Sequence, residues 1–349
     1  MRPESESFFI RLLEAAGPSG DEGAAARVWR DYASGFGEAT SDAMGSSYVS
    51  AGDGAPTIAV FGHIDEIGLA IVYIDDDGYL WFSSVGGWVP TVLVAQRVRV
   101  LTKDGPVVGV IGQKPPHLTD AEERKIAPKL KELWIDIGAA DGEAARKLVG
   151  IGDLAVLEQP VLRLQGQRLA SRAVDDRTGA FVAAESVRLY AESPGPGKLV
   201  GVASVQEETN FGGAHTAGYA IAPDAAIVVD VTHCSDYSGV KKTEIGDVRL
   251  SRGPVINRGS GVHSALTELA IETARAEGIP FQVEAAMGRT YTDADAVALS
   301  RAGVPCSVVS IPNRYMHSPN EIVDLDDLEA TAALVAAIAR RLERVPELS

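Results

Sequence analysis

Residues 57–68 read TIAVFGHIDEIG, an apolar run that ends in His63, Asp65 and Glu66. This pattern predicts a short buried strand with ionisable side chains at its carboxyl end, which is where open α/β sheets place their chemistry. After residue 168, further apolar runs alternate with helical patterns. Strands are expected at 199–205, 225–231, 281–286 and 306–311, and helices at 178–192, 293–301 and 326–344. The alternation favours an α/β fold in which helices sandwich a mixed sheet.

The two ends of the chain are expected to be helical. A helix is predicted over residues 7–15, ended by the turn sequence GPSG at 17–20, and a second helix is predicted over 22–32. Near the other end, Asp324 and Asp326 are candidate N-caps of the last helix.

The segment from about Ile71 to Glu158 has a different texture. Its valine-rich alternation, as in VLVAQRVRVLTKDGPVVGVIG (92–112), is typical of strands, and Asp104-Gly105 is a hairpin signal. A charged stretch at 121–132 predicts a surface loop or short helix. We therefore expect a small β-rich insert within the α/β fold.

Composition limits the range of functions. The chain has 349 residues, 46% of them hydrophobic, which is more than a single small domain needs. It carries 32 basic and 48 acidic residues, a formal net charge of -16. This charge would repel phosphate backbones and anionic lipid surfaces, so we expect neither nucleic acid nor a membrane as a partner.

The cysteines and the first residues bear on location. Cys234 and Cys306 both lie among apolar residues, so no disulfide framework is expected and a reducing compartment is favoured. The first apolar run follows two glutamates rather than a basic segment, and no stretch approaches 18 uninterrupted apolar residues. These features predict a cytoplasmic protein without a membrane span.

Five places put ionisable side chains directly after an apolar strand or at the mouth of a loop. They are His63-Ile64-Asp65-Glu66, Asp175-Asp176, Glu207-Glu208, Asp230 and His317. Burying so many charges without partners is costly, so the carboxylates must be solvated, protonated, paired or bound to metal. A metal centre accounts for all five places together.

The kinds of side chain indicate the chemistry. Two imidazoles and at least three carboxylates suit a divalent ion such as zinc, cobalt or manganese, and without thiolates the set is not a zinc finger. In an extended segment His63 and Asp65 project to the same side, so Asp65 can orient the imidazole. Glu207 and Glu208 must point in different directions, which lets one bind metal while the other carries protons, as metal-assisted hydrolysis requires.

The motifs also carry a family resemblance. GHIDEIG, AVDDRTG, QEE followed by GGA, VVDVTH and YMHSPNE occur in this order over nearly the whole chain. They closely resemble the dinuclear aminopeptidases known as glutamyl or deblocking aminopeptidases, which build tetrahedral dodecamers and include relatives labelled endoglucanases. The resemblance implies a catalytic α/β domain over residues 1–69 and 164–349. It also implies a β-rich insert over 70–163 that helps to assemble a homo-oligomer, expected to be a dodecamer.

Carried over position by position, the resemblance assigns a metal-binding role to five residues. Asp175 would bridge two divalent ions about 3.5–4 Å apart. One ion would add His63 and Asp230, and the other would add Glu208 and His317. Zinc is the first expectation for the metal, with cobalt and manganese as alternatives.

The resemblance also implies catalytic roles. Glu207 would be the general base and later the general acid, Asp65 would support His63, and Asp176 would be a structural neighbour of the bridge. His233 is a candidate outer neighbour of the metals, whereas His117, His215 and His263 are expected to be structural. The chain departs from the family pattern at 209–213 and at 288–297, next to the expected substrate pocket.

We therefore predict a metal-dependent aminopeptidase that hydrolyses the first peptide bond of short peptides. Two alternatives stay open: a glycoside hydrolase that uses the carboxyls of Glu207 and Glu208, and a metal-bound oligomeric scaffold without catalysis.

Overall fold

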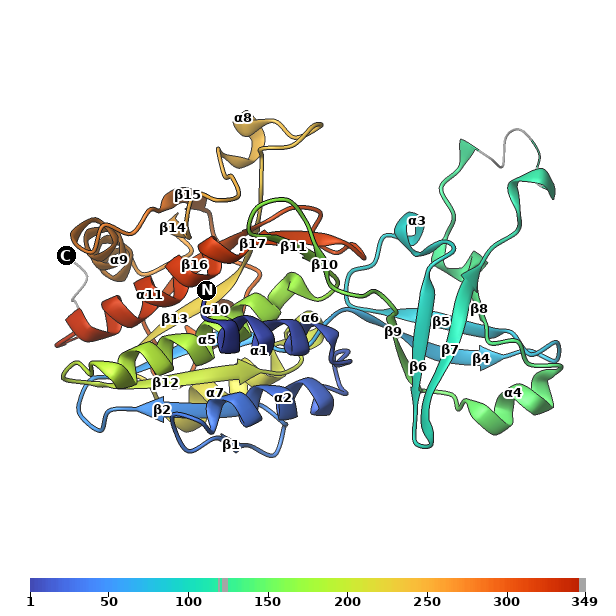
Figure 1. Ribbon diagram of the computed structural model, residues 1–349, viewed down its shortest axis with the longest axis horizontal. Coiled ribbons are helices and arrows are strands. Elements are labelled where there is room, and N and C mark those ends of the chain that lie inside the picture. Colours follow the sequence, from blue (N-terminus) through green and yellow to red (C-terminus); the bar gives the residue numbers. More distant parts are fainter. Residues whose placement is uncertain (119, 121–124, 345–349) are drawn as a thin grey trace.

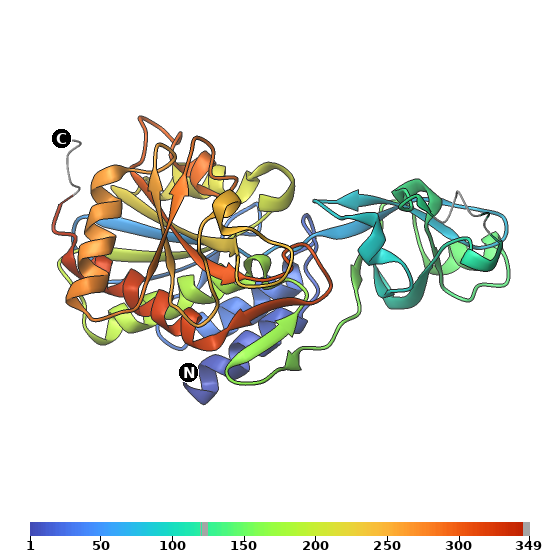
Figure 2. The same cartoon turned by 90° about the horizontal axis from the view of Figure 1, so that it is seen from above.

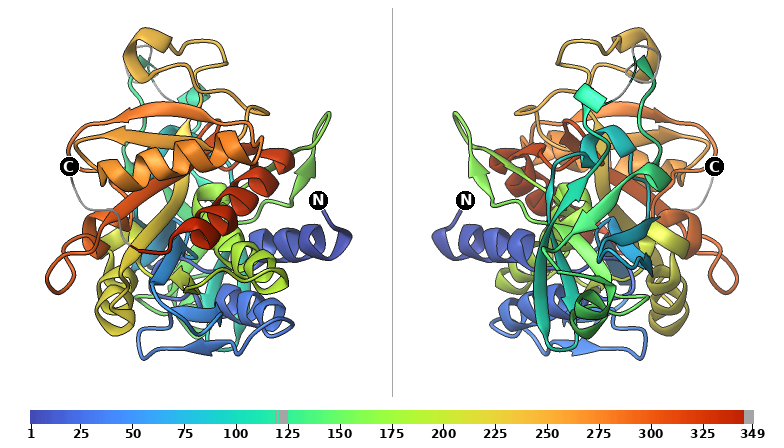
Figure 3. Two further views of the ribbon diagram at one scale, coloured as in Figure 1. Left: turned by 90° about the vertical axis from the view of Figure 1, so that its left-hand side faces the viewer. Right: turned by 90° about the vertical axis from the view of Figure 1, so that its right-hand side faces the viewer.

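The computed structural model describes residues 1–118, 120 and 125–344. The chain forms an α/β part, built around a large sheet, and a β-barrel beside it (Figure 1). Seen from above, extended segments connect the two parts, and the barrel forms one end of an elongated molecule (Figure 2). Viewed from that end, the barrel lies in front of the α/β part (Figure 3, right).

The large sheet has eight strands in the order β1-β2-β12-β3-β13-β16-β14-β15. The central strands β12, β3, β13 and β16 run parallel to one another, whereas β2 and β14 pair antiparallel with β12 and β16. The sheet is therefore mixed, as predicted. The strands span Thr40–Ser41 (β1), Ser47–Ala51 (β2), Thr57–His63 (β3), Lys198–Ser204 (β12), Ala225–His233 (β13), Val255–Gly259 (β14), Gln282–Ala286 (β15) and Cys306–Asn313 (β16).

Helices cover both faces of this sheet. Ile58 and Val60 of β3 belong to one apolar core, and Ala59 and Phe61 belong to another, because successive side chains of a strand point to opposite faces. The first core includes side chains of α1 (Pro3–Glu14), α2 (Gly23–Ala33), α5 (Val174–Glu192), α9 (Ser264–Ala276) and α11 (Leu325–Arg341). The second includes side chains of α7 (Gly212–Ile221) and α10 (Ala294–Val297).

The insert closes into a barrel in the strand order β4-β5-β8-β7-β6-β9. The barrel has its own apolar core, which includes Leu69, Leu80, Val98 and Ile135. The predicted hairpin is present, with Thr102 opposite Gly105 in β6 and β7. The strands span Gly68–Ile74 (β4), Leu80–Val85 (β5), Arg97–Thr102 (β6), Gly105–Gly112 (β7), Trp134–Asp136 (β8) and Leu154–Leu157 (β9).

Short elements complete the chain. The helices are α3 (Pro90–Leu93), α4 (Gly142–Leu148), α6 (Glu207–Asn210), α8 (Lys242–Ile245), η1 (Pro116–Leu118) and η3 (Leu130–Glu132). A small antiparallel sheet, β10-β11-β17, spans Leu162–Arg163 (β10), Arg168–Ser171 (β11) and Glu321–Asp324 (β17). The loop or helix predicted at 121–132 falls partly outside the described residues, since these omit 121–124, and its last three residues form η3.

The predicted fold class, a mixed α/β sheet between helices with a small β-rich domain inserted, is confirmed. The helix predicted at 293–301 is wrong in length, because α10 ends at Val297 and the chain then turns, with Arg301 at a φ of 51°. Strand β14 and helix α9 were not predicted. Asp324 is the cap of α11, since its carboxylate accepts the backbone N–H of Asp326. Within the described residues, no helix is long and apolar enough to span a membrane.

Candidate metal centre

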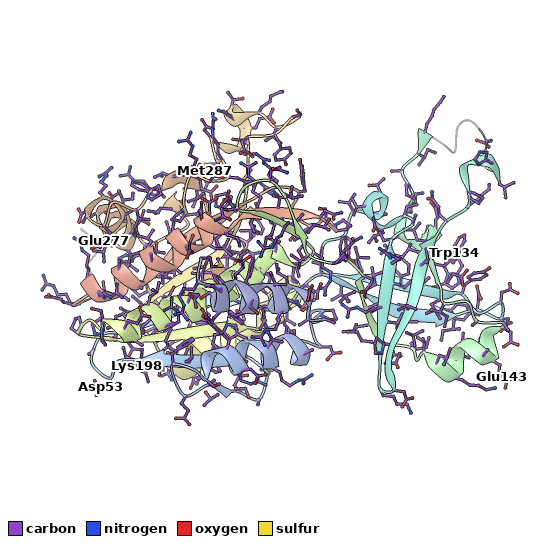
Figure 4. The ribbon with its side chains drawn as sticks, in the orientation of Figure 1. Asp53, Trp134, Glu143, Lys198, Glu277 and Met287 are labelled. Atoms are coloured by element: carbon purple, nitrogen blue, oxygen red, sulfur yellow. The ribbon has the colours of Figure 1, made fainter. Side chains whose placement is uncertain are left out.

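Three adjacent parallel strands bring most of the predicted residues to one edge of the large sheet. His63 is the last residue of β3, and Asp230 lies near the end of the neighbouring strand β13. Glu207 and Glu208 follow β12, on the other side of β3, at the start of α6. Lys198, the first residue of β12, lies at the end of the sheet far from the barrel (Figure 4). The carboxyl ends of these strands therefore face the barrel.

The remaining two residues arrive through the small sheet. Ser171 of β11 pairs with Glu321 of β17, which places the start of α5 beside the loop that follows β16. Asp175 lies in the first turn of α5, and His317 lies in that loop. All five predicted metal ligands thus meet at one place, although they come from separate segments.

Asp175 lies between the two imidazoles. Its Oδ1 is 3.2 Å from Nε2 of His63, and its Oδ2 is 3.2 Å from Nε2 of His317. The carboxylate is buried, with 8% of the residue exposed. Each of its oxygens is therefore paired with a different ring nitrogen, which is the arrangement of a carboxylate that can serve two ions at once.

The two glutamates also face different imidazoles. Glu207 Oε2 is 3.7 Å from Nε2 of His63, and Glu208 Oε1 is 3.6 Å from Nε2 of His317. Glu208 Oε1 is buried and has no hydrogen-bond partner among the described residues. A buried carboxylate oxygen without a partner is expensive, and a cation would satisfy it.

The spacing of these atoms fits divalent ions. Two ligand atoms bound to one zinc at about 2.0–2.1 Å in a tetrahedral arrangement lie about 3.3 Å apart. The donor distances of 3.2, 3.2, 3.6 and 3.7 Å are close to that value. Two sets of three donors have ligand atoms within 4.8 Å of one another, namely His63 with Glu207 and Asp230, and His63 with Asp175 and Glu208. The sets share His63, so the grouping by distance differs from the division that the resemblance implies.

Buried carboxylates dominate the electrostatics. Burial raises the pKa of Glu207 to about 11 and that of Glu208 to about 8, and neighbouring carboxylates act in the same direction. Burial also raises the pKa of Asp230. Because a bound cation favours the ionised form of nearby acids, such a cluster is a chemically suitable place for one.

At the two imidazoles, burial and the neighbouring carboxylates shift the pKa in opposite directions. Burial would lower the pKa of His63, but the charge of Glu207 and the contacts with Asp175 outweigh it, so the pKa is raised. Burial is likewise outweighed at His317, whose pKa rises to about 9 beside Asp175. Burial would raise the pKa of Asp175, but the two imidazoles hold it below its ordinary value. Asp175 is therefore ionised between two rings.

Asp65 connects two parts of the site. Nδ1 of His63 lies 3.2 Å from the backbone oxygen of Asp65 and 3.4 Å from its Oδ1. The Asp65 carboxylate also accepts the backbone N–H groups of Glu207 and Glu208, at 3.1 and 3.2 Å. Asp176 accepts hydrogen bonds from the backbone N–H groups of His63 and Gly179.

Sequence reasoning missed two buried acids. Glu321 accepts the backbone N–H of Asp175 at 2.9 Å and that of His317 at 2.7 Å, so it ties two donor segments together. It belongs to the quoted motif YMHSPNE, in which only the histidine was assigned. Asp293 accepts a hydrogen bond from Ser204 Oγ, and burial raises its pKa to about 6. It lies within the segment 288–297, which was noted as a departure from the family and, from residue 293, as the start of a helix, without a role in the site.

Backbone conformation is also unusual here. Ala173, Gln206 and His317 have φ angles of 57°, 60° and 57°. Left-handed conformations cost a non-glycine residue about 1–3 kcal/mol, and they persist where the surrounding contacts impose them, often at functional sites.

A cavity of about 340 Å³ opens onto the donors. The segment 288–297 contributes Thr290, Tyr291 and Thr292 to its lining, which also includes Thr232, His233 and Met316. Among the described residues, no lysine or arginine lines this cavity. His233 thus lies near the donors.

The other histidines lie elsewhere. His117 is exposed in η1 and His215 is exposed in α7. His263 caps α9, where its Nδ1 accepts the backbone N–H of Leu266 at 3.4 Å.

Comparison with known proteins identifies the family. The profile of the M42 glutamyl aminopeptidases matches residues 45–334. The chain is 34% identical over 340 residues to a lysyl aminopeptidase of Pyrococcus furiosus, covering 95% of this chain and 96% of the relative. Its fold is similar to the crystal structure of a TET aminopeptidase from a marine sediment archaeon, Thaumarchaeota archaeon SCGC AB-539-E09. The TM-score is 0.93 and the sequence identity is 35%, and the match covers 97% of this chain and 96% of the archaeal one. The TET1 peptidase of Pyrococcus horikoshii matches with a TM-score of 0.87 and 31% identity, over 97% of this chain and 100% of that one. That peptidase is described as able to assemble into a tetrahedron or a large octahedral shell. The chain therefore belongs to the M42 glutamyl aminopeptidase family of peptidases.

Proposed function

We propose that this protein is a metal-dependent aminopeptidase that removes the N-terminal residue from short peptides. The observation that carries the proposal is the position of Asp175, whose two oxygens each lie 3.2 Å from a different imidazole nitrogen. A carboxylate shared in this way suits a centre of two ions, and two-metal sites are common in aminopeptidases.

In this proposal two divalent ions would be held by the five donors, with Asp175 shared between them. His63 and Asp230 would complete the ligands of one ion, and Glu208 and His317 would complete those of the other. Zinc is the first candidate, and cobalt and manganese are alternatives, because imidazole and carboxylate ligands suit all three.

Glu207 is the proposed proton carrier. Divalent ions bound at the site would polarise the carbonyl group of the scissile peptide bond and lower the pKa of a water molecule. Glu207 accepts a proton from the attacking water on its carboxylate and delivers it to the nitrogen of the leaving peptide. Its side chain lines the cavity, and Asp65 holds its backbone N–H, so the carboxylate is oriented toward the space that a substrate would fill.

We also propose that the chain assembles into a homo-oligomer, a dodecamer in line with its resemblance to the TET peptidases. The proposed catalytic domain covers residues 1–69 and 164–349, and the insert at 70–163 would mediate assembly. Val72, Val108 and Ile151 of the barrel are 51%, 69% and 64% exposed, and a neighbouring subunit could cover them. Both cysteines are free and buried, which fits a reducing cytoplasm.

The site is less suited to the two alternatives. A glycoside hydrolase needs two carboxyls that face one bond from either side, whereas Glu207 and Glu208 face different imidazoles, and the imidazoles would have no role. A non-catalytic scaffold would not require an open cavity beside the donors.

The test is hydrolysis of aminoacyl anilides by protein that has been chelated and then reloaded with zinc, cobalt or manganese. Glu207→Gln should lower kcat by about 100- to 10,000-fold, the usual contribution of a general base, while two ions per chain remain bound. Glu277→Gln is the matched control, because Glu277 is exposed and lies at the end of the α/β part away from the barrel (Figure 4).

Three results would contradict the proposal. Full activity of Glu207→Gln would remove Glu207 from its role. Glucan hydrolysis that persists in chelator would favour the glycosidase, and an oligomer that is inactive on every peptide with every metal would favour the scaffold.

A further inference from the structure

A loop of the barrel reaches the candidate metal centre. Residues Gly86, Gly87 and Trp88 follow β5, and the backbone oxygen of Gly87 lies 3.1 Å from Nδ1 of His317. These two residues are 230 positions apart in the chain. We propose that Gly87 is a positioning residue, which fixes the ring of His317 so that its Nε2 can bind one of the two ions. This inference rests on the proposed function, in which His317 is a metal ligand.

The chemistry of the contact determines the tautomer of the ring. A backbone carbonyl can only accept a hydrogen bond, so Nδ1 of His317 must carry the hydrogen. In the neutral ring, the form that binds a metal ion, Nε2 then presents its lone pair, and it lies 3.2 Å from Asp175 Oδ2 and 3.6 Å from Glu208 Oε1. Metal-binding histidines usually donate their second ring N–H to a fixed acceptor, which holds the ring orientation and increases its basicity.

The absence of a side chain at Gly87 is what permits this contact. A Cβ built on Gly87 would lie 3.0 Å from Nδ1 and 3.1 Å from Cε1 of His317, and it would approach no other described atom within 4 Å apart from its chain neighbours. The φ angle of Gly87 is not in the left-handed region. An alanine at this position would therefore strain the ring of His317 without a backbone penalty.

The adjacent glycine lies beside the other proposed ligand of the same ion. A Cβ on Gly86 would lie 3.3 Å from Glu208 Oε2 and 2.4 Å from a methyl carbon of Ile67. Trp88 and Ile67 line a small cavity together with Asp175, Glu208 and His317. The barrel loop thus packs against the side of the centre that holds Glu208 and His317.

His317 is held from two sides. Glu321 accepts its backbone N–H at 2.7 Å, and Gly87 accepts its ring N–H at 3.1 Å. The first contact comes from β17 of the α/β part and the second from the barrel. The ring is also 34% exposed, so packing alone does not immobilise it. The ion bound by Glu208 and His317 should therefore depend on the barrel more than the ion bound by His63 and Asp230.

The experiment is a metal titration of chelated Gly87→Ala with Co²⁺, followed by calorimetry and by the visible absorption of the bound ion. One of the two ions should bind about 10- to 100-fold more weakly, as is usual when a partner of a ligating histidine is lost, with a changed spectrum, and the other should bind as in the wild type. Gly150→Ala is the matched control in the barrel, since its φ angle is also outside the left-handed region and a Cβ there meets nothing closer than 3.7 Å.

A double-mutant cycle tests whether Gly87 acts through the ring. In a His317→Ala background, Gly87→Ala should change neither the affinity nor the spectrum any further. Wild-type binding of both ions by Gly87→Ala would overturn the inference, and so would an equal loss in both backgrounds. Peptide hydrolysis tests the proposed function separately, because a chain that cannot cleave peptides could still give the expected result in the double-mutant cycle. A wild-type chain that binds no ion would overturn both the proposed function and this inference.

Discussion

Replacing Glu321 by glutamine should loosen the metal centre although Glu321 is not one of the proposed ligands. Its carboxylate is buried and accepts the backbone N–H groups of Asp175 and His317, at 2.9 and 2.7 Å. Glutamine has nearly the same shape but only one acceptor oxygen, so its NH₂ group would face one of the two N–H groups. One donor is then left without a partner, and the segment that carries it must shift.

The magnitude follows from the lost contact. Leaving a buried N–H donor without its acceptor costs about 1–3 kcal/mol. We take the upper part of this range, about 2–3 kcal/mol, for Glu321→Gln, because Glu321 is only 2% exposed. If the whole of that free energy opposes the binding geometry of Asp175 or His317, metal affinity falls about 30- to 140-fold, at about 1.4 kcal/mol for each factor of ten.

The assay compares two carboxylates that differ mainly in location. Asp327 is also buried and also accepts two backbone N–H groups, from Ser251 and Gly253, both at 2.7 Å. Asp327→Asn should therefore lower the free energy of unfolding about as much as Glu321→Gln does, when both are measured by denaturant titration of the chelated proteins. Only Glu321→Gln should also weaken zinc binding in competition with a chromophoric chelator. Equal zinc affinity in the two variants would refute the reasoning, because Glu321 would then be an ordinary structural carboxylate.

Three further outcomes are expected. Chelated protein should lose stability as the pH rises from about 5 to 9. In the folded chain the pKa of Glu208 is raised from 4.5 to about 8 and that of His317 from 6.5 to about 9, so the unfolded chain releases both protons at lower pH than the folded chain does. A melting temperature that rises over this range would contradict the prediction. Peptides that begin with an uncharged residue should have a higher kcat/KM than glutamyl peptides, since no described lysine or arginine lines the cavity to pair with a glutamyl side chain, and the reverse order in an anilide series would show that assumption to be wrong. Arg177→Met should lower the free energy of unfolding by about 3–5 kcal/mol, because it removes a buried guanidinium that lies 2.8 Å from Glu66 and also donates to the backbone oxygens of Leu12 and Ile64; a denaturation midpoint equal to that of the wild type would argue against this.

Much of the architecture was predictable because it depends on short-range patterns. The apolar run 57–62 is a strand because it is hydrophobic on both faces, and His63 ends it as expected. Asp324 caps α11 through a hydrogen bond within three residues of sequence. The hairpin turn at Asp104-Gly105 was likewise predictable from neighbouring residues alone. Where a weak local pattern competes with tertiary context, prediction fails, as it does for the four-residue helix α10 and for β14.

The amino-acid sequence by itself determined which side chains were available for chemistry and that each followed a strand or opened a loop, because those features are written in windows of a few residues. Only the tertiary structure decided how they face one another: that Asp175 lies between two imidazoles, that Glu321 joins two donor segments, and that a barrel glycine accepts the ring N–H of His317. The reason is physical. A contact between atoms 230 residues apart leaves no local pattern, since it depends on the order of strands in the sheet and on the docking of the insert.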